Sequence, residues 1–259
     1  MLDLGRWLVW AVAGFFATSA TAQDMMHHVD LSSPAYSSAE MTRAEVEALL
    51  KAGQGGADLS GKSLNGLDLS RLDLSGVNFH AARMNGAKLT GARLDGAILD
   101  QIWAIGADFS QASLKKAHLF GSQMQETKCD GANFSGARVA ADLSRASLRG
   151  ANFTGADLAA DMRNQSMGLM RAVLKSADLT GANFEDANLA ATDLQFAKFT
   201  GADLRGASLA GAEAGGADFR NAIFDHTNFT GTDVTSARIE AAQEKAFASA
   251  KNLERAFKE

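Results

Sequence analysis

A hydrophobic residue recurs at every fifth position of this chain, from Leu59 almost to the C-terminus. A small residue, usually alanine, stands two places before it, and Asp, Asn or another polar residue stands one place before it. Glycine often follows two places after it. We call the hydrophobic member the central residue of each repeat. Central residues include Leu59, Leu64, Leu69, Leu74, Phe79, Met84, Leu89, Leu94 and Leu99, and later Leu174, Leu179, Phe184, Leu189, Leu194, Phe199, Leu204 and Leu209.

A period of five matches neither a helix, which repeats every ~3.6 residues, nor a simple strand, which alternates. If the central residue and the small residue two places before it point inward, the other three must carry the chain around a corner. A chain that turns the same way every five residues closes into coils, and stacked coils bond to one another as neighbouring strands do. Asp and Asn suit such corners because their side chains accept from nearby backbone N–H groups. The pattern therefore predicts an all-β solenoid.

The motif is plainest in the later run of repeats. Residues 177–181 read Ala-Asp-Leu-Thr-Gly, and residues 182–186 read Ala-Asn-Phe-Glu-Asp. This pattern of alanine, then Asp or Asn, then Leu or Phe resembles the pentapeptide-repeat family, and the resemblance covers residues 57–239. It implies a right-handed quadrilateral parallel β-helix with four pentapeptides in each coil. A repeat region of this length would then form about nine coils.

Short helices are expected at both ends of the solenoid, because an open end coil exposes core side chains and unpaired backbone groups. Thr42 and Glu45 form the capping box of an N-terminal capping helix over 41–53. Apolar residues at three- to four-residue spacing predict an amphipathic helix over 240–259. This second helix would either cap the last coil or pair with another copy of the chain in a homodimer. The polar residues 23–40 are expected to form a flexible linker.

Residues 1–22 resemble a secretory signal peptide. Arg6 supplies a positive start, residues 7–17 are apolar, and Ala-Thr-Ala at 20–22 forms a cleavage site. The apolar run is short for a membrane span. We therefore expect an exported protein, periplasmic or extracellular, with no stable membrane insertion after the signal is cleaved. An uncleaved membrane anchor is the alternative.

Thioether and imidazole side chains gather just after the cleavage site, in Met25, Met26, His27 and His28. Methionine favours reduced copper, and histidine binds copper in either oxidation state. These four residues therefore predict a copper site. The alternative is a mobile leader with no binding role. No other residues suggest a metal or a cofactor, and the absence of a recognisable catalytic motif predicts that the protein is not an enzyme.

One group of apolar residues stands where the repeat normally places polar ones. Ile98 and Trp103 precede central positions, whereas Ile105 and Phe120 follow them. Clustered exposed apolar residues usually mark a contact surface. These four residues therefore predict a partner-binding patch on two adjacent faces of the solenoid. The alternative is a distorted coil in which Trp103 turns inward to fill the space left by Ala104.

The repeat is irregular in one region. Val139 and Leu143 are four residues apart, and Leu158 and Leu169 are eleven apart, so a missing residue and an extra one cancel. Residues 159–168 fit the pattern poorly. We expect them to bulge or kink the coil.

Composition narrows the function only slightly. The chain has 259 residues and a formal net charge of −5, with positive and negative residues interleaved. No nucleic-acid-binding surface is predicted. The favoured function is an exported, non-enzymatic structural or interaction module that binds an unidentified protein partner. The alternative is a copper-handling protein of the cell envelope. A third function, implied by the resemblance, is a topoisomerase-binding mimic of duplex DNA, which the signal peptide and the mixed charges disfavour.

Overall fold

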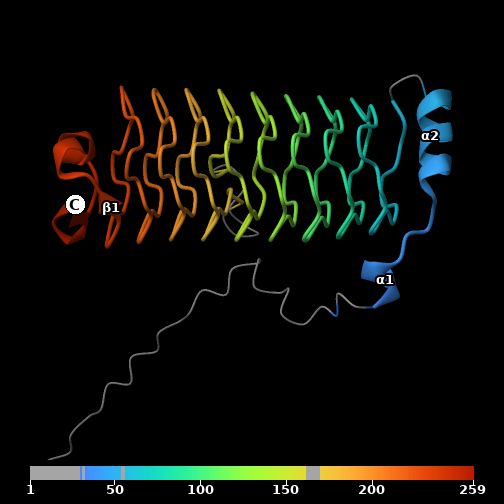
Figure 1. Ribbon diagram of the computed structural model, residues 1–259, viewed down its shortest axis with the longest axis horizontal. Coiled ribbons are helices and arrows are strands. Elements are labelled where there is room, and N and C mark those ends of the chain that lie inside the picture. Colours follow the sequence, from blue (N-terminus) through green and yellow to red (C-terminus); the bar gives the residue numbers. More distant parts are fainter. Residues whose placement is uncertain (1–29, 31–32, 54–55, 162–169) are drawn as a thin grey trace, which may run out of the picture.

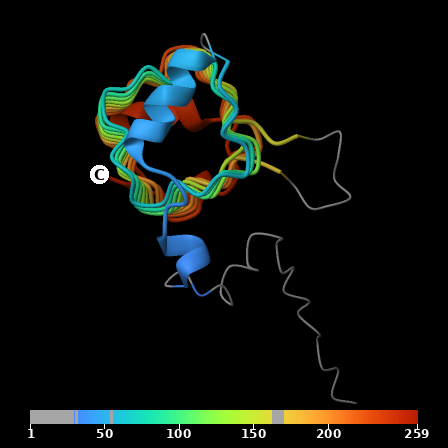
Figure 2. The same cartoon turned by 90° about the vertical axis from the view of Figure 1, so that its right-hand side faces the viewer.

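Stacked coils form a rod in the computed structural model of this chain, and each coil has four sides when seen along the rod (Figures 1 and 2). The structure describes residue 30 and residues 33–53, 56–161 and 170–259. Parallel β-bridges join residues one coil apart, for example Asp58 to Asn78, a separation of 20 residues. A period of five and a coil of twenty place four pentapeptides in each regular coil.

Backbone hydrogen bonds hold each coil to the next. The Leu59 N–H donates to the Asn78 carbonyl at 2.8 Å, and the Asn78 N–H donates to the Ala57 carbonyl at 3.0 Å. Equivalent bonds recur on the other sides of the rod, so each side is a narrow parallel sheet. Because every coil pairs with the ones before and after it, unpaired backbone groups are confined mainly to the two ends.

A regular corner is a four-residue turn whose third residue has a positive φ. At the first corner the Lys62 N–H donates to the Leu59 carbonyl at 3.2 Å, and Gly61 has a φ of 67°. Oδ1 of Asp58 accepts from the Ser60 N–H at 2.9 Å. Glycine adopts a positive φ without steric cost, which explains its recurrence two places after the central residue.

The core is the column of central residues together with the small residues two places before them. Leu189 and Ala187 are typical, with exposed fractions of 0% and 1%. Phenylalanines stack from coil to coil, with ring centroids 4.7 Å apart between Phe134 and Phe153 and 4.8 Å apart between Phe153 and Phe184. The inward placement predicted from the period is confirmed.

Two irregular coils follow each other in the middle of the rod. Arg138 bridges Asp157 at a separation of 19, and Asp157 bridges Asn188 at a separation of 31. The first coil is therefore one residue short, and the second carries surplus residues. A short coil can still close, because the missing residue comes from a corner and the bridging positions keep their alignment.

The surplus residues leave the coil at Asp161 and return at Met170, and the Asp161 N–H donates to the Met170 carbonyl at 2.8 Å. Figure 2 shows the stem of this excursion projecting from one side of the rod. The expected bulge is confirmed at its described ends, because the surplus residues leave the coil after Leu158 and the coil resumes at Ala172, whose N–H donates to the Leu158 carbonyl at 3.3 Å. Residues 162–168 of the predicted bulge lie outside the described residues. The predicted central residue Leu169 lies outside the described residues.

Two helices precede the rod: α1, Pro34–Ser37, lies beside it, and α2, Arg43–Ala52, lies across its N-terminal end (Figures 1 and 2). The predicted capping box begins α2. Oγ1 of Thr42 accepts from the Glu45 N–H at 3.3 Å, and the Glu45 carboxylate accepts from the Thr42 N–H at 2.7 Å. Val46 is fully buried, and α2 packs onto the first coil through this side chain.

The C-terminal segment is not the amphipathic helix expected over 240–259. Its elements are strand β1, Arg238–Ile239, the 3-10 helices η2, Ala241–Phe247, and η3, Leu253–Arg255, and strand β2, Phe257–Lys258. β2 pairs in parallel with β1, and Lys251 bridges Asp233. The segment therefore follows the path of one more coil, because the backbone groups left open by the last regular coil need partners. Phe247 is buried in the core beside Phe229, with ring centroids 4.2 Å apart.

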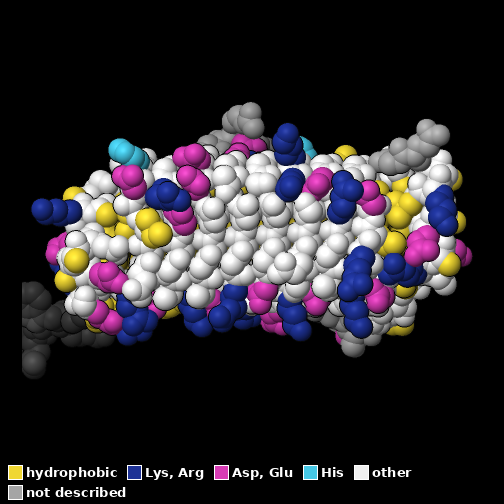
Figure 3. Space-filling model, turned by 45° about the horizontal axis from the view of Figure 1, so that its top comes forward, with side chains coloured by type: hydrophobic (Ala, Val, Ile, Leu, Met, Phe, Trp, Pro, Cys, Tyr) yellow, Lys and Arg dark blue, Asp and Glu magenta, His cyan; other side chains and the backbone are white. Residues whose placement is uncertain are grey.

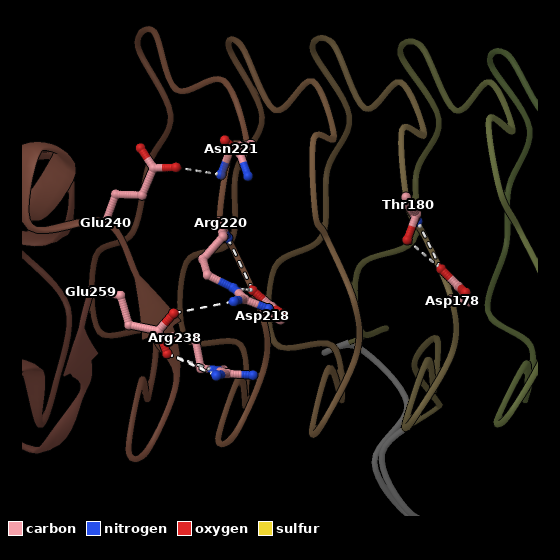
Figure 4. Close-up of polar contacts among 8 residues, drawn as sticks. All are labelled: Asp178, Thr180, Asp218, Arg220, Asn221, Arg238, Glu240 and Glu259. Carbon is pink, nitrogen blue, oxygen red and sulfur yellow. Dashed lines mark hydrogen bonds and ion pairs between the residues drawn. The ribbon is translucent and has the colours of Figure 1, made fainter.

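Ion pairs hold the last residue of the chain against this coil (Figure 4). The Glu259 carboxylate pairs with Arg238 at 2.8 Å and with Arg220 at 3.1 Å. Arg220 also pairs with Asp218 at 2.6 Å. The hydrogen bond from Arg238 lowers the pKa of Glu259, and the hydrogen bond from Arg220 lowers the pKa of Asp218. Both carboxylates are therefore charged at neutral pH.

Candidate partner-binding surface

Outward residues line up in columns, because the β-bridges join equivalent positions of successive coils. The column through Trp103 consists of Ser63, Arg83, Trp103, Gln123, Asp142, Val173, Asp193, Glu213, Asp233 and Lys251. The column on the preceding side of the rod consists of Asp58, Asn78, Ile98, His118, Arg138, Asp157, Asn188, Ser208 and Asn228. We call the two sides that carry these columns the Trp103 face and the Ile98 face.

The four residues of the predicted patch lie on these two adjacent faces, as their positions in the repeat required. Trp103 and Ile105 belong to the Trp103 face, and Ile98 and Phe120 belong to the Ile98 face. Ile98 is 40% exposed, whereas the other three are half-buried. The structure therefore groups the predicted residues around one corner, but it leaves only part of their surface open.

Trp103 keeps its regular place in the coil. Its N–H donates to the Ala82 carbonyl at 2.9 Å, and its carbonyl accepts from the Met84 N–H at 2.6 Å. Ala104 occupies the inward position and is fully buried. The alternative considered from the sequence, a distorted coil with Trp103 turned inward, is wrong.

Residues 33–40, which we call the strap, cover part of the Trp103 face. The Tyr36 ring packs on the Trp103 ring, with centroids 5.0 Å apart and planes inclined by 37°. The Tyr36 carbonyl accepts from the Asn85 side-chain amide at 3.3 Å. The expectation of a flexible linker over 23–40 is therefore wrong for the strap, because both its ring and its backbone bind the rod.

Polar contacts continue along the strap toward α2. The Ser38 carbonyl accepts from Ser63 Oγ at 2.5 Å, and the Glu40 N–H donates to the Ser63 carbonyl at 2.9 Å. The Glu40 carboxylate pairs with Lys62 Nζ at 3.1 Å. The hydrogen bond from Lys62 lowers the pKa of Glu40. The strap thus contacts the first coils through one aromatic pair and a series of polar bonds.

Arg171, at the end of the excursion, joins the Trp103 face farther along the rod. Its Nη1 donates to Glu213 Oε1 at 2.7 Å, and its Nη2 lies 3.9 Å from Asp193 Oδ2. Burial raises the pKa of Asp193, whereas the hydrogen bond from Arg171 lowers the pKa of Glu213. Sequence reasoning missed this group because Arg171 and Glu213 are 42 residues apart, and only the coiling of the chain brings them together.

A pocket of about 370 Å³ opens next to this group. Its lining residues are Gln195, Phe196, Glu213, Gly215, Gly216, Asp233, Thr235 and Ser236. Phe196 stands two places after Leu194, a position that glycine often occupies in this repeat. A bulky residue at that position, facing two consecutive glycines one coil later, is a sequence signal that could have located the pocket.

Charges of both signs alternate along the rod. The column that follows the Trp103 face consists of Asp68, Lys88, Asp108, Lys128, Ser147, Asp178, Lys198, Asp218 and Arg238. Figure 3 shows a similar mixture on one side of the molecule, with a broad uncharged band between rows of charged side chains. Such a surface lacks the continuous negative charge of a nucleic-acid duplex.

The predicted copper ligands Met25, Met26, His27 and His28 lie outside the residues that the structure describes, as does the predicted signal peptide at 1–22. Within the described ranges, no group of three or more His, Cys, Asp or Glu side chains could hold a metal ion. Nor does any helix in the described part of the chain have the length and apolar character needed to cross a membrane. Copper binding and export stay predictions.

The family model for pentapeptide repeats matches the chain in eight copies. The matched residues are 55–91, 63–101, 105–138, 139–160, 169–206 and 202–240. The chain belongs to the pentapeptide-repeat family. The family's right-handed β-helix is the architecture of the rod described above. No curated protein matches the chain.

Solved structures of other pentapeptide-repeat proteins resemble the rod. Trypsin-treated QnrB1, a plasmid-mediated fluoroquinolone resistance protein, is 21% identical with a TM-score of 0.53, and the match covers 68% of this chain and 81% of QnrB1. HetL, involved in heterocyst differentiation regulation in the cyanobacterium Nostoc sp., is 25% identical with a TM-score of 0.29, over 75% of this chain and 98% of HetL. The likeness to QnrB1 shows a shared fold.

Proposed function

We propose that this pentapeptide-repeat protein is an exported, non-enzymatic rod that binds a protein partner through its Trp103 face. About nine coils form the rigid scaffold, with α2 closing one end and the irregular last coil closing the other. Trp103 carries the proposal, because this large aromatic side chain stands outward on a rod whose outward positions are mostly polar, and the Tyr36 ring leaves it half-buried rather than fully covered. Tryptophan is among the residues most enriched at energetically important interface positions.

Asp side chains of the rod accept hydrogen bonds from its corners, and this structural role supports a scaffold rather than an enzyme. Oδ1 of Asp178 accepts from the Thr180 N–H at 3.1 Å and from the Thr180 hydroxyl at 2.5 Å (Figure 4). Cys129 faces inward, and burial raises the pKa of its thiol to about 12. A thiol with such a pKa supplies no nucleophilic thiolate at neutral pH.

Chemical cross-linking of the full-length protein in an envelope fraction tests the partner-binding proposal. We expect a cross-linked product that Trp103→Ala abolishes. Lys115→Ala is the matched control, because Lys115 is exposed on the opposite side of the rod, two pentapeptides further around the coil. A product that resists Trp103→Ala, or that both variants abolish equally, would remove the Trp103 face from the proposal.

Export rests on the signal-peptide pattern of residues 1–22. We expect the mature protein from its native host to begin at Gln23, which N-terminal sequencing and intact mass would show. A mature mass that includes residues 1–22 would indicate a retained anchor and would contradict export by this route.

Copper handling rests on Met25, Met26, His27 and His28 alone. Copper titration should give a higher stoichiometry for the parent than for a variant with all four residues changed to Ala. Equal stoichiometries would end this alternative.

A topoisomerase-binding mimic of DNA has less support. The likeness to QnrB1 at 21% identity is a likeness of fold, and the alternating column of Asp68, Lys88, Asp108 and Lys128 does not reproduce the charge of a duplex. A gyrase-inhibition assay with the purified rod would test this function directly, and we expect no inhibition.

A homodimer through residues 240–259 would use the last coil rather than a helix. Phe257 on β2 is 59% exposed there. Sedimentation of the parent and of Phe257→Ser would show whether this side chain supports self-association, since a dimer built on it should dissociate in the variant.

A further inference from the structure

Phe196 is the third residue of a regular corner, a position that glycine often occupies in this repeat. Its φ is 58°, a left-handed conformation that is unfavourable for a bulky side chain. The ring nevertheless stays 59% exposed, so burial in the core does not explain why a phenylalanine stands there.

The next coil makes room for the ring. A Cβ added at Gly216 would lie 2.6 Å from Cδ1 of Phe196, so any other residue there would force the ring to move. Gly215 occupies the outward position that Gln195 holds one coil earlier and Thr235 holds one coil later. Gly215 therefore adds no side chain to this row, and it lines the pocket of about 370 Å³.

Both charged residues that line the pocket are carboxylates, Glu213 and Asp233. Oε1 of Glu213 accepts from Arg171 at 2.7 Å, and its Oε2 accepts from the Gln195 amide at 3.2 Å. Arg171 itself does not line the pocket. The hydrogen bond from Arg171 lowers the pKa of Glu213, so this group is ionised at neutral pH.

The two carboxylate oxygens of Asp233 differ in their hydrogen bonds. Its Oδ1 accepts from the Thr235 N–H at 2.9 Å, the Thr235 hydroxyl at 2.7 Å and the Asn252 amide at 3.0 Å. Its Oδ2 has no hydrogen-bond partner among the described residues. The bond from Asn252 lowers the pKa of Asp233, and the nearby charge of Arg255 acts in the same direction. An ionised acceptor therefore lines the pocket together with the Phe196 ring.

We infer that this pocket binds the guanidinium group of an arginine side chain. The planar group stacks on an aromatic ring and donates several N–H bonds in one plane, so Phe196 can contact its face while Asp233 accepts at its edge. Gly215 gives the space that the side chain needs. The inference rests on the proposed function, since it names the chemistry of the partner segment that the rod binds.

Nuclear magnetic resonance titration of the full-length protein with N-acetyl-L-arginine amide tests the inference. We expect saturable shifts of the Gly215 and Gly216 backbone amides, with a dissociation constant on the order of 1 mM for so small a probe. The neutral isostere N-acetyl-L-citrulline amide should bind more weakly by about fivefold or more, because it lacks the charge. Absence of saturable shifts, or equal binding of the two probes, would overturn the inference.

Two variants locate the binding energy. Asp233→Asn keeps a side-chain acceptor for the turn, as Asn133 shows by accepting from the Ser135 N–H at 2.9 Å, but it removes the charge. We expect about fivefold weaker arginine binding. Asp178→Asn removes the same charge from another face of the rod and should leave binding unchanged. Equal weakening of arginine binding by both variants would show that only the overall charge of the protein matters. That result would refute the site.

Phe196→Gly removes the aromatic wall while giving the corner its usual residue. Binding should weaken by about threefold or more, the effect of an exposed cation–aromatic contact. Unchanged binding would remove Phe196 from the site. These titrations involve no protein partner, so their failure would leave the cross-linking result standing, and a failed cross-linking experiment would leave the pocket's ligand chemistry intact.

Discussion

The Trp103 face carries two aromatic interruptions of the repeat, and their surroundings are opposite. Trp103, near the N-terminal end, is half-buried beneath Tyr36 of the strap. Phe196, toward the C-terminal end, is 59% exposed beside an open pocket. Both residues lie on coils with regular backbone bonding, so the coil itself does not create the difference. The repeat decides which side chains face outward, whereas segments outside the repeat decide which of these stay accessible.

A charge at an inward position should destabilise the protein most, because the surfaces around Trp103 and Phe196 depend on the same core. Leu209→Asp places a charge where the side chain is 0% exposed, and we expect a loss of more than about 4 kcal/mol of unfolding free energy. Ser208→Asp is the matched control, since its position faces outward and Asp is common there. Circular dichroism with urea unfolding measures both. Equal stability of the two variants would contradict the inward assignment.

Removing the Tyr36 ring should make Trp103 more accessible to solvent, as Phe196 already is. Tyr36→Ala deletes the ring on Trp103, and we expect the strap to lose about 1 kcal/mol of docking free energy. Trp103 emission should shift to the red and become easier to quench with acrylamide. The measurement uses a background carrying Trp7→Phe and Trp10→Phe, which leaves Trp103 as the single tryptophan. Phe257→Ala in the same background is the control and should leave the emission unchanged, and an unchanged spectrum in Tyr36→Ala would show that the ring does not shield Trp103.

Acid should loosen the strap through a smaller effect. The hydrogen bond from Lys62 lowers the pKa of Glu40 below its ordinary 4.5, so the pair stabilises the folded strap above about pH 4.5. This contribution disappears as the pH falls through the lowered pKa. Acrylamide quenching of Trp103 should therefore increase below pH 4.5 in the parent. Glu40→Gln should show the higher quenching already at neutral pH, with a weaker dependence on acid. The same profile in both proteins would exclude the Glu40–Lys62 pair as the cause.

Phe196→Gly should change the free energy of unfolding only slightly, and this is the smallest of the four predicted effects. The left-handed conformation costs a side-chain-bearing residue about 1–2 kcal/mol, and glycine relieves this cost while adding about 0.5–1 kcal/mol of unfolded-state entropy. We expect a net change within about 1 kcal/mol in thermal or urea unfolding. Phe199→Gly, at a buried position of the same coil, should cost at least about 3 kcal/mol. A large destabilisation by Phe196→Gly would mean that this ring supports the fold rather than a binding site.

Much of the architecture was determined locally, by the five-residue repeat. Asp58 and Gly61 make a corner with atoms of their own pentapeptide, and Leu59 turns inward as a result. Four such corners complete a coil without help from distant residues, so the period alone predicted the solenoid and its core. The capping box of Thr42 and Glu45 is equally local, and it placed the start of α2.

The C-terminal segment shows where a local pattern misled. Apolar residues at helical spacing predicted a helix over 240–259, but the last regular coil offers open backbone groups that outweigh this preference. The Phe257 N–H donates to the Ala237 carbonyl at 2.8 Å, and the Glu259 N–H donates to the Ile239 carbonyl at 3.0 Å. An edge left by tertiary structure therefore decided the conformation of the segment.

Only the tertiary structure decided what covers the outward residues. The sequence placed Trp103 outward but gave no sign that Tyr36, in a polar stretch 67 residues earlier, would stack on it. It likewise left Phe196 as an isolated exception to the repeat, until the coil of 20 residues set its ring against Gly216. A repeat encodes the direction of each side chain through bonds within one pentapeptide. The neighbours of that side chain come from other coils and from segments outside the repeat, and these contacts form only when the chain has folded.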